Sequence, residues 1–171
     1  EMSISQYLKN PLDEALKESV EHASAKLGHE IYNFAEKDLP NQGDITDTHC
    51  IYSLVDREKY DEIYNLAAQS HVATSFTEPQ ATFQINTIGV LNLLEAIRRF
   101  SMHTRFYQAS TSEMFGSSKP PQNETTIFHP RSPYGVSKLA AHWLVSNYQE
   151  SYNLRAACGI MFNSESSRRG K

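Results

Sequence analysis

Arg105-Phe-Tyr-Gln-Ala-Ser-Thr-Ser-Glu113 begins as a short run typical of a β-strand and ends in hydroxyl groups and a carboxylate. We predict a strand at Arg105–Ser110 and a loop at Ser112–Ser132. Two segments with helical character flank this region, the strongly apolar Gln80–Phe100 and Tyr134–Tyr152. A strand between helices of this length is typical of a parallel sheet, because parallel strands need long crossover connections.

The same alternation continues on both sides. Glu62–Ala68 and Arg155–Phe162 are short apolar runs with the character of buried strands. Asp44–Tyr60 predicts a helix after its first few residues, with Thr46 or Asp47 as its N-cap. This order of elements predicts an α/β fold, a doubly wound parallel sheet covered by helices on both faces.

Three polar stretches directly follow the predicted strands: Ala67–His71, Ser110–Glu113 and Asn163–Arg169. In open α/β sheets, ligands bind beyond the carboxyl ends of the strands. We therefore expect the binding site at the edge of the sheet where these stretches meet.

The bulk composition is that of an ordinary globular protein. The chain has 171 residues, of which 39% are hydrophobic and 21% charged, and its formal net charge is -4. It has no basic stripe, acidic tail or apolar run long enough to span a bilayer, so we expect no nucleic-acid partner and no membrane partner. Cys50 and Cys158 form no metal-ligand spacing, so we expect no metal site, and two buried thiols fit a reducing, cytoplasmic setting.

Tyr134 and Lys138 are four residues apart on a predicted helix, so their side chains share one face. A lysine ammonium beside a tyrosine lowers the pKa of the phenol, which is about 10 when unperturbed. Such a tyrosine can exchange a proton with a substrate alcohol while a hydride moves to or from a nicotinamide. Pairs at this spacing also occur on ordinary helices, but Thr111-Ser112-Glu113 upstream and the rigid entry Pro130-Arg-Ser-Pro133 favour a catalytic interpretation.

Four runs carry a resemblance to a known family: Tyr64-Asn-Leu-Ala-Ala-Gln-Ser-His-Val72, Arg105-Phe-Tyr-Gln-Ala-Ser-Thr-Ser-Glu113, Pro130-Arg-Ser-Pro-Tyr-Gly135 and Asn163-Ser-Glu-Ser-Ser-Arg-Arg-Gly170. They resemble the GDP-mannose 4,6-dehydratases, extended members of the short-chain dehydrogenase/reductase superfamily, over roughly residues 43–170. The resemblance implies that residues 43–171 are the central part of an NAD(P)-binding, Rossmann-like domain. Residues 1–42 have no assignment.

The resemblance also implies an activity, the conversion of GDP-mannose to GDP-4-keto-6-deoxymannose with transient hydride transfer to a nicotinamide cofactor. This is a hydro-lyase reaction on the route to GDP-fucose. Tyr134 resembles the general base at the C4 hydroxyl, and Lys138 would lower its pKa and bind the nicotinamide ribose. Thr111 would hold the C4 oxygen and Glu113 would take the C5 proton, which the 4-keto group acidifies.

Further contacts are implied by the same resemblance. NADP is the expected cofactor, with NAD as the alternative. The expected cofactor contacts, besides Tyr134 and Lys138, are Asp44, Ile45, Leu66, Ala67, Ala68, Gln69, Ser70, Ser164 and Arg169. The expected substrate contacts are Ser112, Glu113 and Asn163. The expected partner is GDP-mannose or a related nucleotide sugar, and the full-length protein is expected to be a homo-oligomer.

Several features depart from the family pattern. Ser164 replaces a histidine, Ser167 a proline and Ala81 a tyrosine near the cofactor, and the loop between Glu113 and Tyr134 is one residue shorter. The seven glycines form no Gly-x-x-Gly-x-x-Gly turn, the motif whose backbone binds pyrophosphate. We therefore expect an interior segment of a larger protein or a truncated gene product. Two alternatives stay open, another nucleotide-sugar epimerase or dehydratase of the superfamily and a non-catalytic remnant.

Overall fold

The computed structural model describes residues 43–163. The chain divides into two compact units, one of residues 1–44 with 163–171 and one of residues 45–162. In the first unit only Gly43, Asp44 and Asn163 are described, so the architecture below is that of the second unit. Residues 1–42, which have no assignment from the sequence, lie outside the described residues.

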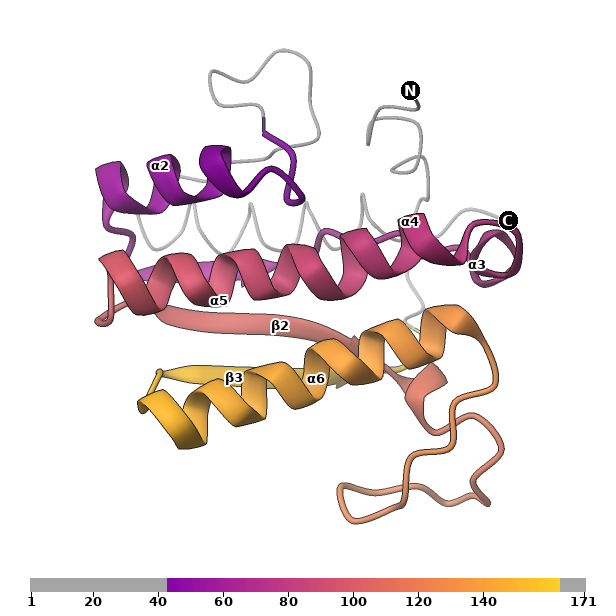
Figure 1. The fold of residues 1–171 in the computed structure, drawn as a ribbon. Coiled ribbons are helices and arrows are strands. Elements are labelled where there is room, and N and C mark those ends of the chain that lie inside the picture. The colour runs from indigo at the N-terminus through magenta and orange to yellow at the C-terminus, as the bar shows by residue number, and fades with distance from the viewer. Residues whose placement is uncertain (1–42, 164–171) are drawn as a thin grey trace, which may run out of the picture. The chain divides into compact units, whose positions relative to one another are not determined.

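A parallel sheet of three strands forms the centre of the second unit. The strands are β1 (Glu62–Asn65), β2 (Arg105–Thr111) and β3 (Ala156–Met161), in the order β1-β2-β3. Figure 1 shows helices α5 and α6 in front of β2 and β3, and α6 contacts both of these strands. The predicted parallel α/β architecture is confirmed.

The helix α6 (Pro133–Tyr152) has well-defined ends. The side chain of Ser132 accepts a hydrogen bond from Gly135 N at 3.0 Å, and Pro133 occupies the first turn, where its missing N–H costs nothing. Asn153 ends the helix in the left-handed conformation with φ of 58°. The buried face of α6 joins the hydrophobic core through Ala141 and Val145, among others.

The predicted helix Gln80–Phe100 is three consecutive segments. They are α4 (Pro79–Phe83), a π-helix η2 (Gln84–Ile88) and α5 (Gly89–Phe100). One extra residue in a helical turn changes which side chains face a neighbour, and such bulges are frequent at functional sites. The apolar periodicity of the segment gave no sign of this insertion.

Two further helices lie on either side of β1 in the chain. The helix α2 (Thr48–Glu58) is capped by Asp47, whose carboxylate accepts from the backbone N–H groups of His49 and Cys50, and this confirms the predicted cap. The short helix α3 (Val72–Thr77), with His71 as its N-cap, was not predicted. Among the described residues, no helix is long and apolar enough to cross a membrane.

Two predicted boundaries need correction. The strand predicted at Glu62–Ala68 ends at Asn65, because the Asn65 side chain accepts from Ala67 N at 3.2 Å and the chain turns out of the sheet. The loop predicted at Ser112–Ser132 opens with one turn of 3-10 helix, η3 (Ser112–Met114).

Candidate active site

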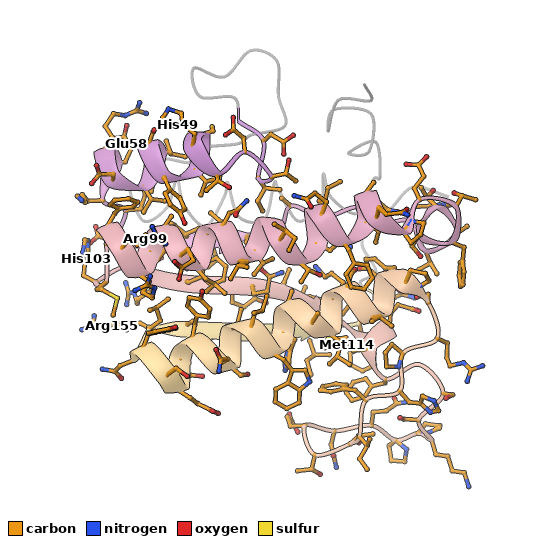
Figure 2. The ribbon with its side chains drawn as sticks, in the orientation of Figure 1. His49, Glu58, Arg99, His103, Met114 and Arg155 are labelled. Atoms are coloured by element: carbon orange, nitrogen blue, oxygen red, sulfur yellow. The ribbon has the colours of Figure 1, made fainter. Side chains whose placement is uncertain are left out.

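Thr111 stands at the carboxyl end of β2, where the chain turns into η3. Its side chain is buried at 9% exposure, and its Oγ1 accepts a hydrogen bond from Glu113 N at 3.2 Å. A hydroxyl carries two acceptor positions and one hydrogen, so the hydrogen of Thr111 stays available to a ligand oxygen. Glu113 itself is exposed, whereas Met114 after it is fully buried and anchors the turn (Figure 2).

Tyr134 and Lys138 lie on the first turns of α6. Both are buried, with 8% and 4% exposure, and their spacing places them on one face of the helix. The backbone of α6 lies close to η3. A Cβ added at Gly135 would lie only 2.8 Å from the carbonyl oxygen of Glu113. The fold therefore brings the first turn of α6, which carries Tyr134, against η3, which begins directly after Thr111.

Asn86, on the π-helix, links the loop after β1 to α6. Its Oδ1 accepts from Gln69 N at 2.8 Å, and its Nδ2 donates to Gln69 O and to Ser137 Oγ, both at 3.0 Å. Ser137 Oγ in turn donates to Tyr134 O at 2.8 Å. Asn86 is 1% exposed, so these bonds are shielded from water and costly to lose.

Thr87 adds a second bond between the same two elements, donating from its hydroxyl to Ser137 O at 2.9 Å. Asn86 and Thr87 are neighbours in the π-helix and both reach α6. Neither was among the predicted site residues. The available signal was two adjacent polar residues inside the strongly apolar segment 83–97, a pattern that favours a polar contact over solvent exposure.

The loop after β1 holds five of the predicted cofactor contacts. Leu66, Ala67, Ala68 and Ser70 are partly buried, and Gln69 is 1% exposed. Gln69 Nε2 donates to Thr82 Oγ1 at 3.1 Å, while its Oε1 is a buried acceptor with no hydrogen-bond partner among the described residues. Small side chains in this loop let a ligand approach the backbone closely.

The remaining predicted contacts are dispersed. Ile45 is a core residue at 6% exposure, and its carbonyl accepts from Asn92 Nδ2 at 3.0 Å. Asp44 and Asn163 are exposed and belong to the first unit. Ser112 is partly buried beside Thr111. Ser164 and Arg169 lie outside the described residues.

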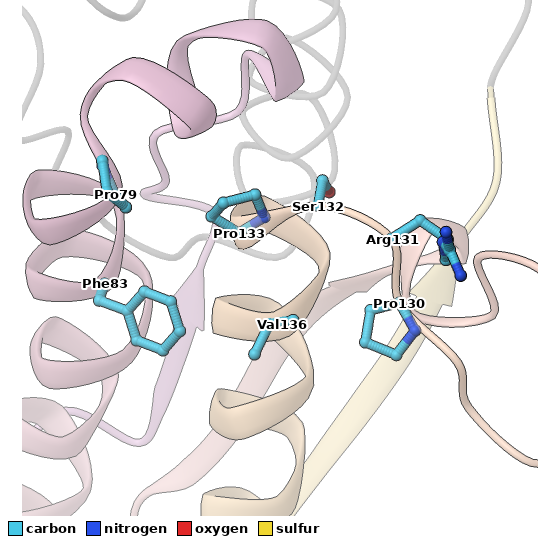
Figure 3. A pocket seen from close by; sticks show the side chains of 7 residues that line it. All are labelled: Pro79, Phe83, Pro130, Arg131, Ser132, Pro133 and Val136. Carbon is cyan, nitrogen blue, oxygen red and sulfur yellow. The ribbon is translucent and has the colours of Figure 1, made fainter.

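An open groove of about 500 Å³ adjoins the start of α6 (Figure 3). Its walls come from α4, from the chain leading into α6 and from α6 itself, and they are lined by Pro79, Phe83, Pro130, Arg131, Ser132, Pro133 and Val136. None of the four candidate catalytic side chains is among them. The groove is mostly apolar with one guanidinium, so it does not provide the proton-transfer chemistry of the strand end.

Comparisons with known proteins show which family the chain resembles. The profile of the GDP-mannose 4,6 dehydratase family matches residues 15–171. The chain is 53% identical over 133 residues to GDP-mannose 4,6 dehydratase 1 of Arabidopsis thaliana, a match that covers 75% of this chain and 37% of that protein. It is 50% identical over 131 residues to the Homo sapiens GDP-mannose 4,6 dehydratase, with 75% and 35% coverage. The chain thus spans about a third of the length of these relatives.

Among solved structures, RMD from Pseudomonas aeruginosa, in complex with NADPH, matches with a TM-score of 0.68 and 31% sequence identity. This match covers 82% of the chain and 47% of RMD.

Proposed function

The chain belongs to the GDP-mannose 4,6-dehydratase family, and we propose that the protein containing it is a hydro-lyase that converts GDP-mannose to GDP-4-keto-6-deoxymannose. One observation carries the proposal. The start of α6, with Tyr134 and Lys138, packs against the backbone of Glu113 next to Thr111. A proton-transfer pair and a separate carboxylate base are thereby available at one strand end, and the dehydration requires both.

Each of the four candidate catalytic side chains has a separate role in the proposed reaction. Tyr134 takes the proton of the C4 hydroxyl as the hydride leaves C4, and the Lys138 ammonium favours the phenolate form that makes this transfer possible. Thr111 donates its free hydrogen to the C4 oxygen, consistent with the bond that its Oγ1 accepts from Glu113 N. Glu113 removes the acidified C5 proton and supplies a proton to the departing C6 hydroxyl, so that water leaves.

A nicotinamide cofactor, when bound, would accept the C4 hydride and return it to C6. The residues present fit such a group, because the loop Leu66–Ser70 carries small side chains and the buried Gln69 Oε1 offers an unused acceptor. Lys138 would bind the nicotinamide ribose, and Asp44, Ile45, Ser164 and Arg169 complete the proposed set of contacts. NADP is the proposed cofactor, supported by the NADPH of the Pseudomonas aeruginosa RMD structure.

The proposed partner is GDP-mannose, held by Ser112, Glu113 and Asn163, and the product would enter GDP-fucose biosynthesis. A cytoplasmic homo-oligomer is the proposed form of the whole protein. The family to which the chain belongs supports the proposed substrate.

The test is Glu113→Gln in the full-length protein, since glutamine keeps the size of glutamate and one acceptor oxygen but has no basicity. The variant should still form reduced cofactor and 4-keto sugar, while 6-deoxy product and solvent deuterium exchange at C5 fall by roughly 10²-fold or more. Parental rates of 6-deoxy product in the variant would overturn the role of Glu113. A parent protein that makes only a C4 epimer, or no product, would favour the epimerase or the non-catalytic alternative.

A further inference from the structure

A polar cluster lies between the sheet and α6, apart from the four candidate catalytic side chains. Ser110, on β2, is 3% exposed, and its Oγ lies 3.1 Å from Nδ1 of His142 on α6. Cys158, on β3, donates to the carbonyl of His142 with an S···O distance of 3.9 Å and also interacts with Ser110. The three residues, which we call the Ser110 cluster, come from three different elements.

Burial favours the uncharged forms of the two titratable groups of the cluster. It lowers the pKa of His142, and it raises the pKa of the Cys158 thiol against the smaller opposing effects of Ser110 and Lys138. A neutral imidazole with Nδ1 unprotonated accepts the Ser110 hydrogen. The ring of His142 is further held edge-on against Phe128, with ring centroids 5.5 Å apart.

The Ser110 cluster is connected to the candidate active site through Ser110 and through His142. Ser110 directly precedes Thr111 on β2, so a shift of Ser110 moves the strand end. His142 is one helical turn beyond Lys138 on the same face of α6. The bond between Ser110 and His142 therefore ties the strand that carries Thr111 to the helix that carries Lys138.

We propose that His142 is a positioning residue: by holding Ser110, it sets the placement of Thr111 relative to Lys138 in the reaction proposed above, on which this inference rests. Without a partner at Nδ1, the buried Ser110 hydroxyl loses its contact with α6 and keeps only its contact with Cys158 on β3, and the strand end relaxes. A displacement of about 1 Å at a reacting group can cost about 10²-fold in rate. His142 would therefore affect turnover more than substrate affinity.

The test compares His142→Leu, His142→Asn and Ser110→Ala in the full-length protein. Asparagine places an amide oxygen close to the position of Nδ1 and can accept from Ser110, whereas leucine cannot. We expect His142→Leu and Ser110→Ala to lower kcat by about 10–100-fold with little change in KM, and His142→Asn to restore most of the loss. His49→Leu is the matched control, because His49 is exposed on α2, well away from Met114 (Figure 2).

A double variant decides whether His142 and Ser110 act as one unit. His142→Leu with Ser110→Ala should be no slower than the slower single variant, because each already breaks the same bond. Hydrogen exchange of the peptide 105–114, followed by mass spectrometry, provides a readout that needs no turnover. Exchange should rise in His142→Leu and stay parental in His142→Asn.

The outcomes separate this inference from the proposed function. A parent protein inactive on GDP-mannose would overturn the proposed function, and the positioning role in that reaction with it, while the exchange data would still decide whether His142 holds the strand end. Parental kcat and exchange in His142→Leu, equal loss in the Leu and Asn variants, or additive losses in the double variant would each overturn the positioning role.

Discussion

Thr111 shows how one hydroxyl serves both the fold and the site. Its oxygen accepts the Glu113 N–H that caps the turn after β2, and its hydrogen is left for a ligand. A valine would keep the shape of the side chain but lose both functions. The division of roles depends on the tight turn at Ser112–Met114, which brings the N–H of Glu113 back to Thr111.

Tyr134→Phe tests the proton-transfer role directly. The ring is retained, so the fold and cofactor binding should be unchanged, while turnover in the full-length protein should fall by about 10²–10⁴-fold, the usual contribution of a positioned acid or base. Cofactor binding by fluorescence titration and turnover by product assay would be measured on the same preparation. Near-parental turnover would remove Tyr134 from the mechanism.

Asn86→Ala should destabilise the fold and loosen the site together. The substitution removes three hydrogen bonds and leaves the Gln69 N–H without its buried acceptor, at a cost of about 2–4 kcal/mol. Denaturant unfolding should show this loss, and cofactor affinity should fall as well. Asn147→Ala is the control, because Asn147 makes one exposed bond to Ser151 and its loss should change stability by less than about 0.5 kcal/mol.

At the scale of elements, the π-helix η2 connects the helical segment of residues 79–100 to the candidate active site. A regular helix through residues 79–100 would still bury its apolar stripe on the core, but the extra residue in one turn changes the helical phase. In the observed phase, Asn86 reaches Ser137 and Thr87 reaches the carbonyl of the same residue. These two bonds fix the first turns of α6 relative to the π-helix, and the bonds of Asn86 to Gln69 extend the link to the loop after β1.

A group of charged and polar side chains around Glu95, which we call the clamp, joins the C-terminal halves of α5 and α6. Glu95 accepts from Arg98 at 2.7 Å, from Arg99 at 3.0 Å and from the hydroxyl of Tyr148 on α6 at 2.8 Å. Chiefly because of the Arg98 bond, the pKa of Glu95 is lowered to about 2. Figure 2 shows Arg99 at this end of α5.

The clamp predicts a pH-dependent stability difference between the parent and Glu95→Gln. A carboxylate whose pKa is depressed in the folded state stabilises the fold above its unfolded pKa of about 4.3 and loses this contribution as the pH falls to the folded value. The difference should be on the order of 1–2 kcal/mol at pH 6, after allowance for the partial exposure of the pair, and vanish between about pH 4.3 and pH 2. Guanidinium unfolding at several pH values would measure it, and a pH-independent difference would contradict the assignment.

At the scale of the whole molecule, the sheet leaves two strands paired on one side only. Within the described residues β1 and β3 form the edges, and Tyr64 and Phe162 are 54% and 56% exposed. Unpaired edges and exposed aromatic side chains favour association with other chains. Residues 43–163 therefore present surfaces that further strands or a partner chain would cover.

We predict that the isolated 171 residues self-associate and bind no nicotinamide cofactor at micromolar concentrations. The sequence has no glycine-rich turn to provide the backbone N–H groups that bind a pyrophosphate. Analytical ultracentrifugation and titration calorimetry with NADPH would test the two parts. A monodisperse monomer would contradict the first, and a micromolar complex would contradict the second.

Sequence alone determined most of the strands and helices and pointed to the main candidate residues. The periodicities located β2 and α6 within one residue at each end, and the neighbouring polar motifs pointed to Thr111, Glu113, Tyr134 and Lys138 as candidates. These features are local, since a strand, a helix cap and an i,i+4 pair depend on residues close together in the chain. For the same reason Asp47 could be predicted as a cap.

Only the tertiary structure decided the contacts that support those residues. Asn86 meets Ser137 across 51 residues and His142 meets Ser110 across 32, and no local pattern encodes either pair. The phase of the π-helix was missed for the same physical reason, and so was the end of β1, where the Asn65 side chain also donates to Gln108 across 43 residues. Helix phase and strand length are set by which buried polar groups find partners, and those partners come from elsewhere in the fold.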